Sequence, residues 1–181
     1  MRCEEEAERR EGADRITRNL NNAPRMPAEG KAPVAILCGG RGTRLQQSTA
    51  SIPKPLVEIG GKPIVWHVIH IYAAHGFDLF TLLTGHRSDQ VDAFVARESW
   101  PQDVTVQTLF TGEDTPTGGR VLQAAEQLDG ETFCVTYADG VADIDLQAEL
   151  ASHQESGRAA TMTVVRPELQ FGSPRLEGTA R

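Results

Sequence analysis

The chain has 181 residues, of which 39% are apolar and 24% are charged, a balance typical of a globular protein. No apolar run approaches the ~20 residues of a membrane-spanning helix, and no apolar stretch follows the first charged residues as it would in a secretory signal. The three cysteines are not closely paired, which favours neither a disulfide framework nor a zinc site and predicts a reducing, cytoplasmic location.

Charge is distributed unevenly along the chain. Residues 1–32 hold seven basic and seven acidic residues, so the rest of the chain carries the whole net charge of −7. An acidic body argues against nucleic-acid binding, which needs a basic surface that follows the phosphates. A small phosphate-bearing ligand needs only a few local cations and backbone N–H groups, and it remains compatible with this charge.

Residues 1–32 are predicted to be a disordered extension, because charged and amide side chains dominate them and Pro24, Pro27 and Gly30 follow. From residue 33 apolar runs alternate with segments of helical spacing, which predicts one domain over residues 33–172. Residues 173–181 are predicted to be an unstructured tail. The expected strands are 34–37, 79–84, 104–110, 132–137 and 160–165, and the expected helices are 64–75, 88–99, 119–128 and 145–156, with Ser88 and Asp145 as N-caps.

Strands that alternate with helices predict an α/β fold with a Rossmann-like, mainly parallel sheet flanked by helices. Ligands of such sheets bind beyond the carboxyl ends of the strands. We therefore expect functional residues to follow residues 37, 84, 110 and 137.

A glycine-rich segment, Gly39-Gly40-Arg41-Gly42-Thr43-Arg44, follows the first predicted strand. Glycines permit positive φ and close backbone approach, so that successive N–H groups can converge on phosphate oxygens, and the arginine adds a bidentate donor. The segment matches neither a Walker A loop nor the dinucleotide fingerprint, whose third glycine would stand where Leu45 is. The alternative interpretation is a tight turn between strand and loop.

Lys54 follows Arg44 after ten residues and lies between two prolines, Pro53 and Pro55. Both prolines restrict φ and favour extended backbone, which predicts a lysine held on a stiff support. A positioned ammonium is useful where phosphate charge builds up during phosphoryl transfer.

Together the glycine-rich segment and the sequence Pro53–Ile64 resemble the sugar-1-phosphate nucleotidyltransferases. Within that family the segments Trp66-His67, Tyr72–Phe77, Thr117–Arg120 and Tyr137–Asp143 look most like the glucose-1-phosphate cytidylyltransferases. The resemblance runs from about Val34 to about Gly172. Because the family continues well beyond this point, the fold is expected to be incomplete at its C-terminal end.

The resemblance implies an enzyme that joins a nucleoside triphosphate to a sugar 1-phosphate and releases pyrophosphate. It implies that Arg44 and Lys54 are the catalytic residues and that Asp139 binds Mg²⁺, the expected cofactor. The implied nucleotide-binding residues are Leu37, Gly39, Gly40, Arg41, Gly42, Thr43, Thr115, Thr117, Gly118, Gly119 and Arg120.

The expected substrates are CTP and α-D-glucose 1-phosphate, with a possible homo-oligomer and with no nucleic-acid or membrane partner. Three alternatives stay open: another base or sugar (dTTP or GTP), a catalytically silent nucleotide binder, and a regulatory subunit of a complete relative. His67 and His70 lie three residues apart on a predicted helix, where they either bind a metal or pack.

Overall fold

The computed structural model describes residues 31–40, 52–128 and 132–165, which form two compact units that meet in sequence between Ile144 and Asp145. The first unit contains β1 (Val34–Leu37), the 3-10 helix η1 (Lys54–Leu56), β2 (Glu58–Ile59), β3 (Lys62–Pro63), α2 (Ile64–Ala74), β4 (Leu79–Thr84), α3 (Ser88–Arg97), β5 (Thr105–Phe110), α4 (Thr117–Gln127) and β6 (Cys134–Tyr137). The second contains α5 (Leu146–Ser156).

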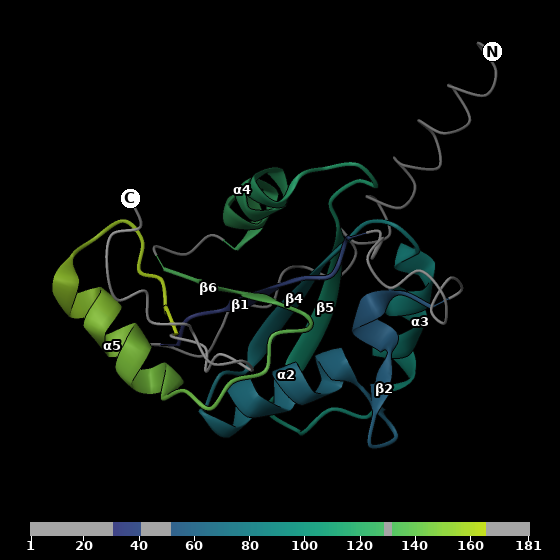
Figure 1. The fold of residues 1–181 in the computed structure, drawn as a ribbon, viewed down its shortest axis with the longest axis horizontal. Helices are drawn as coiled ribbons and strands as arrows, with labels where there is room; N and C mark the ends of the chain where they lie inside the picture. The colour runs from purple at the N-terminus through teal and green to yellow at the C-terminus, as the bar shows by residue number, and fades with distance from the viewer. Residues whose placement is uncertain (1–30, 41–51, 129–131, 166–181) are drawn as a thin grey trace, which may run out of the picture. The chain divides into compact units, whose positions relative to one another are not determined.

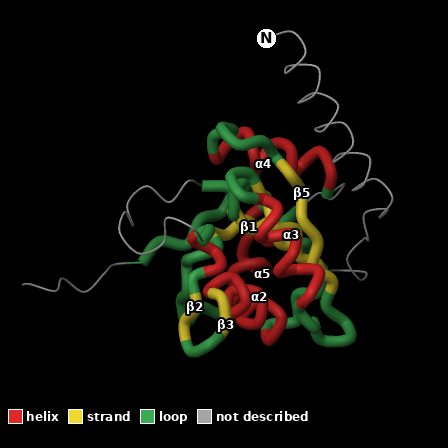
Figure 2. The backbone as a smooth tube through the Cα atoms, turned by 90° about the vertical axis from the view of Figure 1, so that its right-hand side faces the viewer, coloured by secondary structure: helices red, strands yellow, loops and turns green. Residues whose placement is uncertain are grey.

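Four strands of the first unit form a parallel sheet in the order β5-β4-β1-β6 (Figure 1). In this sheet Leu37 of β1 pairs with Leu83 of β4 on one side and with Tyr137 of β6 on the other. The carboxyl ends of three strands therefore lie level at one edge. This arrangement confirms the predicted α/β class, and a small antiparallel hairpin, β2–β3, is added next to α2 (Figure 2).

The helices cover both faces of the sheet, with α4 on one side and α2 on the other (Figure 1). The steps β1→α2→β4 and β4→α3→β5 move in one direction across the sheet, whereas β5→α4→β6 moves back. Right-handed crossovers place helices of opposite steps on opposite faces. The core beneath α4 is built from Ala35, Leu83, Leu109, Ala124 and Leu128.

The direction of winding reverses between β1 and β6, because the chain leaves β1 toward β4 and later returns to the other side of β1. Such a switch point leaves a crevice outside the carboxyl ends of the two strands, where ligands of open α/β sheets bind. Gly39 and Asp139 each follow the paired residues Leu37 and Tyr137 by two positions, one from each side of this switch point.

Three local expectations were wrong. Residues 160–165 form no strand. Lys54 lies in a single 3-10 turn rather than in extended backbone, because the N–H of Leu56 donates to the Pro53 carbonyl at 2.8 Å and a proline φ fits that turn as well. Ser88 is the first residue of α3 rather than its N-cap, since Arg87 precedes it in the left-handed region with φ 57°.

The second unit begins as its sequence indicates. The Asp145 side chain accepts a 3.0 Å hydrogen bond from the N–H of Ala148, so Asp145 is the predicted N-cap of α5. Gly157 ends the helix with φ +59°, a conformation that glycine adopts without steric cost. In the described ranges no helix combines the length and the apolar character that a membrane span requires.

Candidate active site

The end of β1 delivers the first two glycines of the predicted phosphate-binding segment to the switch point. Gly39 is buried and Gly40 is exposed. Leu37, before them, accepts a 3.3 Å hydrogen bond from the N–H of Ala138, which ties the end of β1 to the end of β6. The other predicted residues of this segment lie outside the described residues, namely Arg41, Gly42, Thr43 and Arg44.

Lys54 and Asp139 form an ion pair, although they are separated by 85 positions in the sequence. Pro53 and Pro55 are both buried, and they anchor the 3-10 turn while the ammonium of Lys54 stays accessible. Asp139 stands in the turn after β6, where the N–H of Gly140 donates to the Tyr137 carbonyl at 3.3 Å. The structure thus places a predicted catalytic lysine against the predicted metal carboxylate at the switch point.

Mg²⁺ takes one or two protein carboxylates, keeps several waters, and fills its remaining positions with substrate phosphates. One accessible carboxylate at the end of a strand, next to a cation that can also hold phosphate, fits this pattern. Within the described ranges no group of three or more His, Cys, Asp or Glu side chains gathers into an all-protein cage. Asp139 therefore fits a magnesium ion that is bound together with a polyphosphate.

The β5–α4 loop carries the residues expected to select the nucleotide. Thr117 and Gly118 are exposed in the first turn of α4, and open space surrounds the position that a Cβ on Gly118 would occupy. Gly119 lies against the Thr115 side chain, 2.9 Å from the position of a Cβ. The hydroxyl of Thr115 donates to the Thr111 carbonyl at 2.5 Å, so this side chain closes the loop on itself.

Arg120 is only 5% exposed, and its guanidinium lies under the ends of three strands. It donates to the carbonyls of Thr84 (2.9 Å), Gly39 (3.1 Å) and Glu113 (3.2 Å), and to the hydroxyl of Thr111. Burial lowers the pKa of Arg120 from its ordinary value, and the negative charge of Asp114 opposes this effect. An arginine nevertheless stays charged at neutral pH, so positive charge is fixed at this edge of the sheet.

Cys38 is buried directly after β1, close to the charged groups of Arg120 and Asp139. Burial raises the pKa of its thiol far above the ordinary value, an effect that Arg120 opposes and Asp139 reinforces. A thiol that keeps its proton is a poor nucleophile. Cys38 therefore packs as a small apolar side chain directly after β1.

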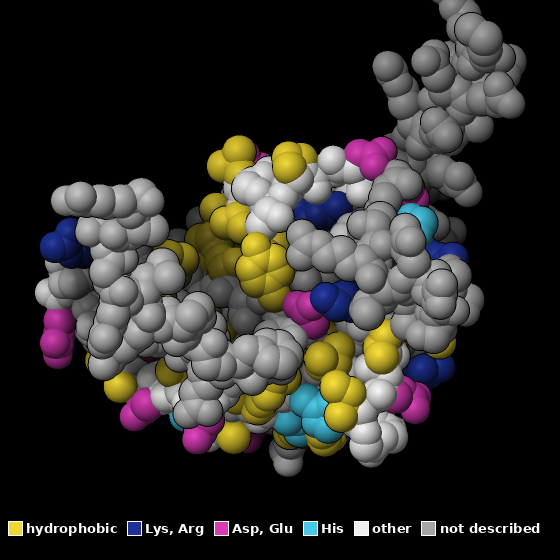
Figure 3. Space-filling model, viewed as in Figure 1, with side chains coloured by type: hydrophobic (Ala, Val, Ile, Leu, Met, Phe, Trp, Pro, Cys, Tyr) yellow, Lys and Arg dark blue, Asp and Glu magenta, His cyan; other side chains and the backbone are white. Residues whose placement is uncertain are grey.

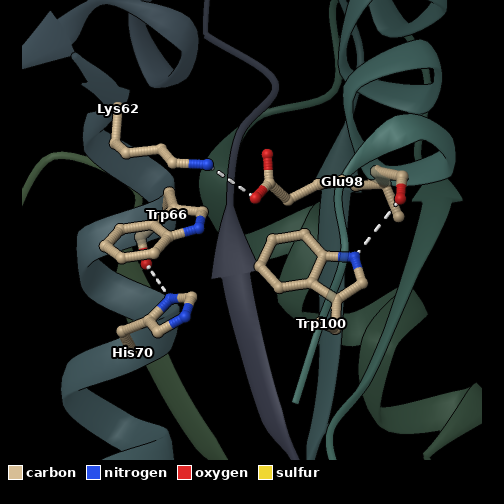
Figure 4. A network of polar contacts seen from close by, with 6 residues as sticks. Lys62, Trp66, His70, Glu98 and Trp100 are labelled. Atoms are coloured by element: carbon tan, nitrogen blue, oxygen red, sulfur yellow. Dashed lines mark hydrogen bonds and ion pairs between the residues drawn. The ribbon is translucent and has the colours of Figure 1, made fainter. Parts of the chain in front are cut away.

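A second cluster of polar and aromatic side chains joins β3, α2 and the end of α3 (Figure 4). The Lys62 ammonium is 2.7 Å from a Glu98 carboxylate oxygen and 5.3 Å from the centre of the Trp66 ring. His70 stacks on Trp66 with ring centres 3.6 Å apart, and its Nδ1 donates to the Trp66 carbonyl at 2.9 Å. The Trp100 indole donates to a carbonyl in α3 at 3.2 Å.

The two histidines predicted on α2 thus take packing positions. His67 Nε2 contacts the Ile59 carbonyl at 2.8 Å, whereas His70 stacks within the aromatic cluster. His86 lies in a turn after β4, with Nδ1 4.0 Å from the Glu113 carboxylate. On the face shown in Figure 3 the basic side chains stand singly among other types, without forming a basic stripe.

Sequence reasoning missed the oxygens that bind Arg120. Thr84 is the last residue of β4 and Thr111 follows β5, and neither residue belongs to a recognisable motif. The acceptors of a buried arginine can be identified only once the strand ends have met in space. Thr111 directly follows residue 110, where functional residues were expected, whereas Thr84 is the last residue of β4 itself. The structure brings together Gly39, Lys54, Asp139 and the β5–α4 loop at one edge.

Comparison with known proteins identifies relatives. A probable glucose-1-phosphate cytidylyltransferase of Bacillus subtilis is 39% identical over 161 residues, which cover 78% of this chain and 63% of that protein. The glucose-1-phosphate cytidylyltransferase of Salmonella typhimurium is 37% identical over 161 residues, 76% of this chain and 62% of that protein. The chain therefore spans less than two thirds of the length of these relatives.

A solved structure, HddC from Yersinia pseudotuberculosis complexed with GMP-PN, matches with a TM-score of 0.60 and 27% identity. The match covers 67% of this chain and 54% of that chain. A family model described as nucleotidyl transferase matches residues 34–175, which include the whole sheet, both sides of its switch point and α5. The chain belongs to the nucleotidyl transferase family.

Proposed function

We propose that this chain carries the nucleotide-binding part of a sugar-1-phosphate nucleotidyltransferase that forms CDP-glucose and pyrophosphate from CTP and α-D-glucose 1-phosphate. The observation that carries the proposal is the contact between Lys54 and Asp139, beside the Gly39 backbone, at the switch point of a parallel sheet. The two cytidylyltransferases described above support the choice of CTP and glucose 1-phosphate.

In the proposed reaction a phosphate oxygen of the sugar 1-phosphate attacks the α-phosphorus of CTP. The bond from that phosphorus to the oxygen bridging to the β-phosphate breaks, and pyrophosphate leaves. Because no covalent enzyme intermediate forms, the protein works by positioning and by neutralising charge. Backbone N–H groups of residues 39–43 and the Arg44 side chain hold the outer phosphates, and Lys54 neutralises the reacting ones.

Asp139 would hold Mg²⁺, which supplies further positive charge to the phosphates when bound. Residues Thr115, Thr117, Gly118 and Gly119 form the loop and the helix start that would select the base. The 11-residue helix α4 points its first N–H groups toward this loop, so its N-terminus favours an anionic ligand. Leu37 and the Gly39 backbone would lie against the base and the ribose.

A second candidate is a nucleotidyltransferase for another base or sugar, including GTP or dTTP. It is favoured by the structural similarity to HddC, whose structure contains GMP-PN. A third is a nucleotide binder without turnover, which the assay below distinguishes from an enzyme. All three candidate functions place the nucleotide at the same edge of the sheet.

The deciding assay incubates the protein with glucose 1-phosphate, Mg²⁺ and, separately, CTP, GTP, UTP or dTTP, and measures released pyrophosphate. The proposal expects turnover with CTP above all other bases. Equal turnover with all four would remove the claim on CTP. Binding of nucleotide without pyrophosphate release would favour the silent binder.

Replacing Lys54 with alanine should lower turnover by about 100-fold or more, since a cation opposite the reacting phosphates is lost. Folding stability should change by less than about 1 kcal/mol, because the ion pair of Lys54 is solvent-exposed. Steady-state kinetics and urea unfolding measure the two effects.

Lys62→Ala is a matched control for Lys54→Ala. Its side chain is 42% exposed against 44% for Lys54, and each lysine pairs with one carboxylate. The control should lose a similar amount of stability and keep its turnover. If Lys54→Ala turns over as fast as Lys62→Ala and the wild type, Lys54 has no role in the reaction.

A further inference from the structure

We propose that Arg120 is a positioning residue that fixes the phosphate-binding end of β1 and the base-selecting β5–α4 loop at one separation, without contacting the nucleotide itself. The inference rests on the proposed function and deepens it, because it names how base selection is coupled to phosphate binding. Arg120 was expected among the nucleotide-binding residues, and its surroundings give it a different task.

The hydrogen bonds of Arg120 join directly two parts of the site that the sheet joins only through β4, which pairs with β1 on one side and with β5 on the other. Nη2 donates to Gly39, where the glycine-rich segment begins, and also to Glu113 in the β5–α4 loop. Nη1 donates to Thr84 at the end of β4 and to the Thr111 hydroxyl. One planar group thus spans the ends of β1 and β4 and the loop that follows β5.

Thr111 completes this support. Its hydroxyl donates to the Thr84 carbonyl at 2.7 Å and accepts from Arg120, while its own carbonyl accepts from Thr115 and from Gln123 at 3.3 Å. The start of the loop is therefore tied both to β4 and, through Arg120, to β1. We name this set, Arg120 with the Gly39, Thr84 and Glu113 carbonyls and the Thr111 hydroxyl, the arginine bracket.

The glycines around the guanidinium show how closely the bracket is packed. A Cβ on Gly39 would lie 2.3 Å from Cζ of Arg120, and a Cβ on Gly85 would lie 2.6 Å from Nη1 and 2.7 Å from the Gly112 carbonyl. Real atoms do not approach so closely, so either side chain would displace the guanidinium. The guanidinium of Arg120 thus fills the space that side chains on Gly39 and Gly85 would otherwise occupy.

A ligand that bridges two loops binds best when their separation is fixed in advance, because ordering them costs free energy on binding. CTP would bridge the end of β1 and the β5–α4 loop, with its triphosphate on the glycine-rich segment that begins at Gly39 and its base at the β5–α4 loop. Inorganic tripolyphosphate would bind only to the glycine-rich segment after β1. Loosening the bracket should therefore weaken CTP much more than tripolyphosphate.

The test compares Arg120→Lys with the wild-type chain by calorimetric titration of CTP and of tripolyphosphate. A lysine keeps the charge but presents one ammonium in place of the planar fork, so it cannot join all the oxygens. We expect the affinity for CTP to fall by about tenfold or more and that for tripolyphosphate by less than about threefold. Arg97→Lys, at the end of α3, is the control and should change neither.

Thr111→Val is the second variant, because it conserves shape, leaves Arg120 in place and removes one of its acceptors. The same selective loss of CTP affinity is expected, together with faster amide hydrogen exchange in residues 111–117 without ligand. A direct contact between Arg120 and nucleotide predicts instead that Thr111→Val binds CTP as the wild type does. That outcome, or unchanged exchange in both variants, would overturn the inference.

The titrations distinguish a failure of the proposed function from a failure of the inference about Arg120. If the wild-type chain binds neither CTP nor any other nucleoside triphosphate, the proposed function is wrong, and the coupling inferred here falls with it. If the wild type binds CTP and both variants lose CTP and tripolyphosphate equally, the proposed function stands and the positioning role of Arg120 is refuted.

Discussion

At the scale of single residues, Gly39 has two separate reasons to be a glycine. The sequence pattern indicates one, since a backbone without a side chain can approach phosphate. The structure adds the other, because the Arg120 guanidinium occupies the place of a Cβ. Gly40, which is exposed and has open space around it, carries only the first reason. Neighbouring glycines of one motif can therefore meet different structural requirements.

Cys38 gives a pH-dependent prediction at the same scale. Because its folded pKa is raised, the folded protein keeps the thiol proton while the unfolded chain loses it above the ordinary value of 9.0. The stability that this residue contributes is fully present below pH 9 and is lost as the pH rises. The loss should approach about 1.4 kcal/mol per pH unit at high pH.

Urea unfolding of the wild type and of Cys38→Ala between pH 7.5 and pH 10.5 measures this effect as a difference between the two proteins. Cys134→Ala, from the neighbouring strand, serves as the control for removing a thiol. A difference between wild type and Cys38→Ala that stays constant over this pH range would contradict the prediction.

At the scale of elements, the ion pair between Lys62 and Glu98 joins the β2–β3 hairpin to the end of α3 (Figure 4). The hairpin was not predicted, since its strands have only two residues each and a period-2 pattern cannot be recognised over that length. The proline-flanked turn of Lys54 precedes it directly. The pair therefore holds the hairpin strand that lies farther from Lys54 in the sequence.

Glu98 gives a second prediction on how stability depends on pH, this time in the acidic range. Lys62 holds the pKa of Glu98 below its ordinary value of 4.5, so the stabilisation by the pair is present above that pH and is lost as the pH falls through the lowered value. At pH 7, Glu98→Gln should cost about 0.5–1 kcal/mol, as for other accessible ion pairs.

Urea unfolding at pH 7 and at pH 3.5 tests this, with Lys62→Ala and the double variant closing a double-mutant cycle. The coupling energy between the two positions should shrink at pH 3.5. A coupling energy that is zero at pH 7 would show that the ion pair stabilises nothing.

At the scale of the whole molecule, the candidate site exists only because distant parts of the chain meet at one edge of the sheet. Lys54 comes from the segment after β1, and Asp139 follows β6, so they meet at the switch point only after the sheet has formed. The arginine bracket likewise joins α4 to the ends of β1 and β4. Damage to the sheet should therefore affect phosphate, metal and base binding together.

Asp139→Asn tests the metal role at this scale. Loss of the carboxylate charge should raise the Mg²⁺ concentration needed for half-maximal CTP binding by about tenfold, since an amide is a much weaker ligand. Folding stability should change by less than about 1 kcal/mol, because the ion pair is accessible. CTP titrations over a range of Mg²⁺ concentrations measure the shift.

Asp143→Asn, four residues further along, is the control and should leave the Mg²⁺ dependence unchanged. If Asp143→Asn shifts the dependence and Asp139→Asn does not, the metal carboxylate has been assigned to the wrong residue of this turn.

The sequence by itself determined the fold class and the edge that carries the site. Alternation of buried strands with amphipathic helices is a local property, and right-handed crossovers convert it into a parallel sheet whose carboxyl ends lie together. The residues after positions 37, 84, 110 and 137 were expected there for that reason. The α5 cap at Asp145 was equally local, since its partner is three residues away.

Only the tertiary structure decided which of these residues touch. A local pattern cannot show that residues 160–165 lack a strand, because a strand exists through hydrogen bonds to a neighbour that the pattern does not contain. Nor can it show that Arg120 is buried against the ends of three strands while Lys54 reaches Asp139. Contacts between residues 36 to 85 positions apart are set by the packing of the sheet, which no single segment encodes.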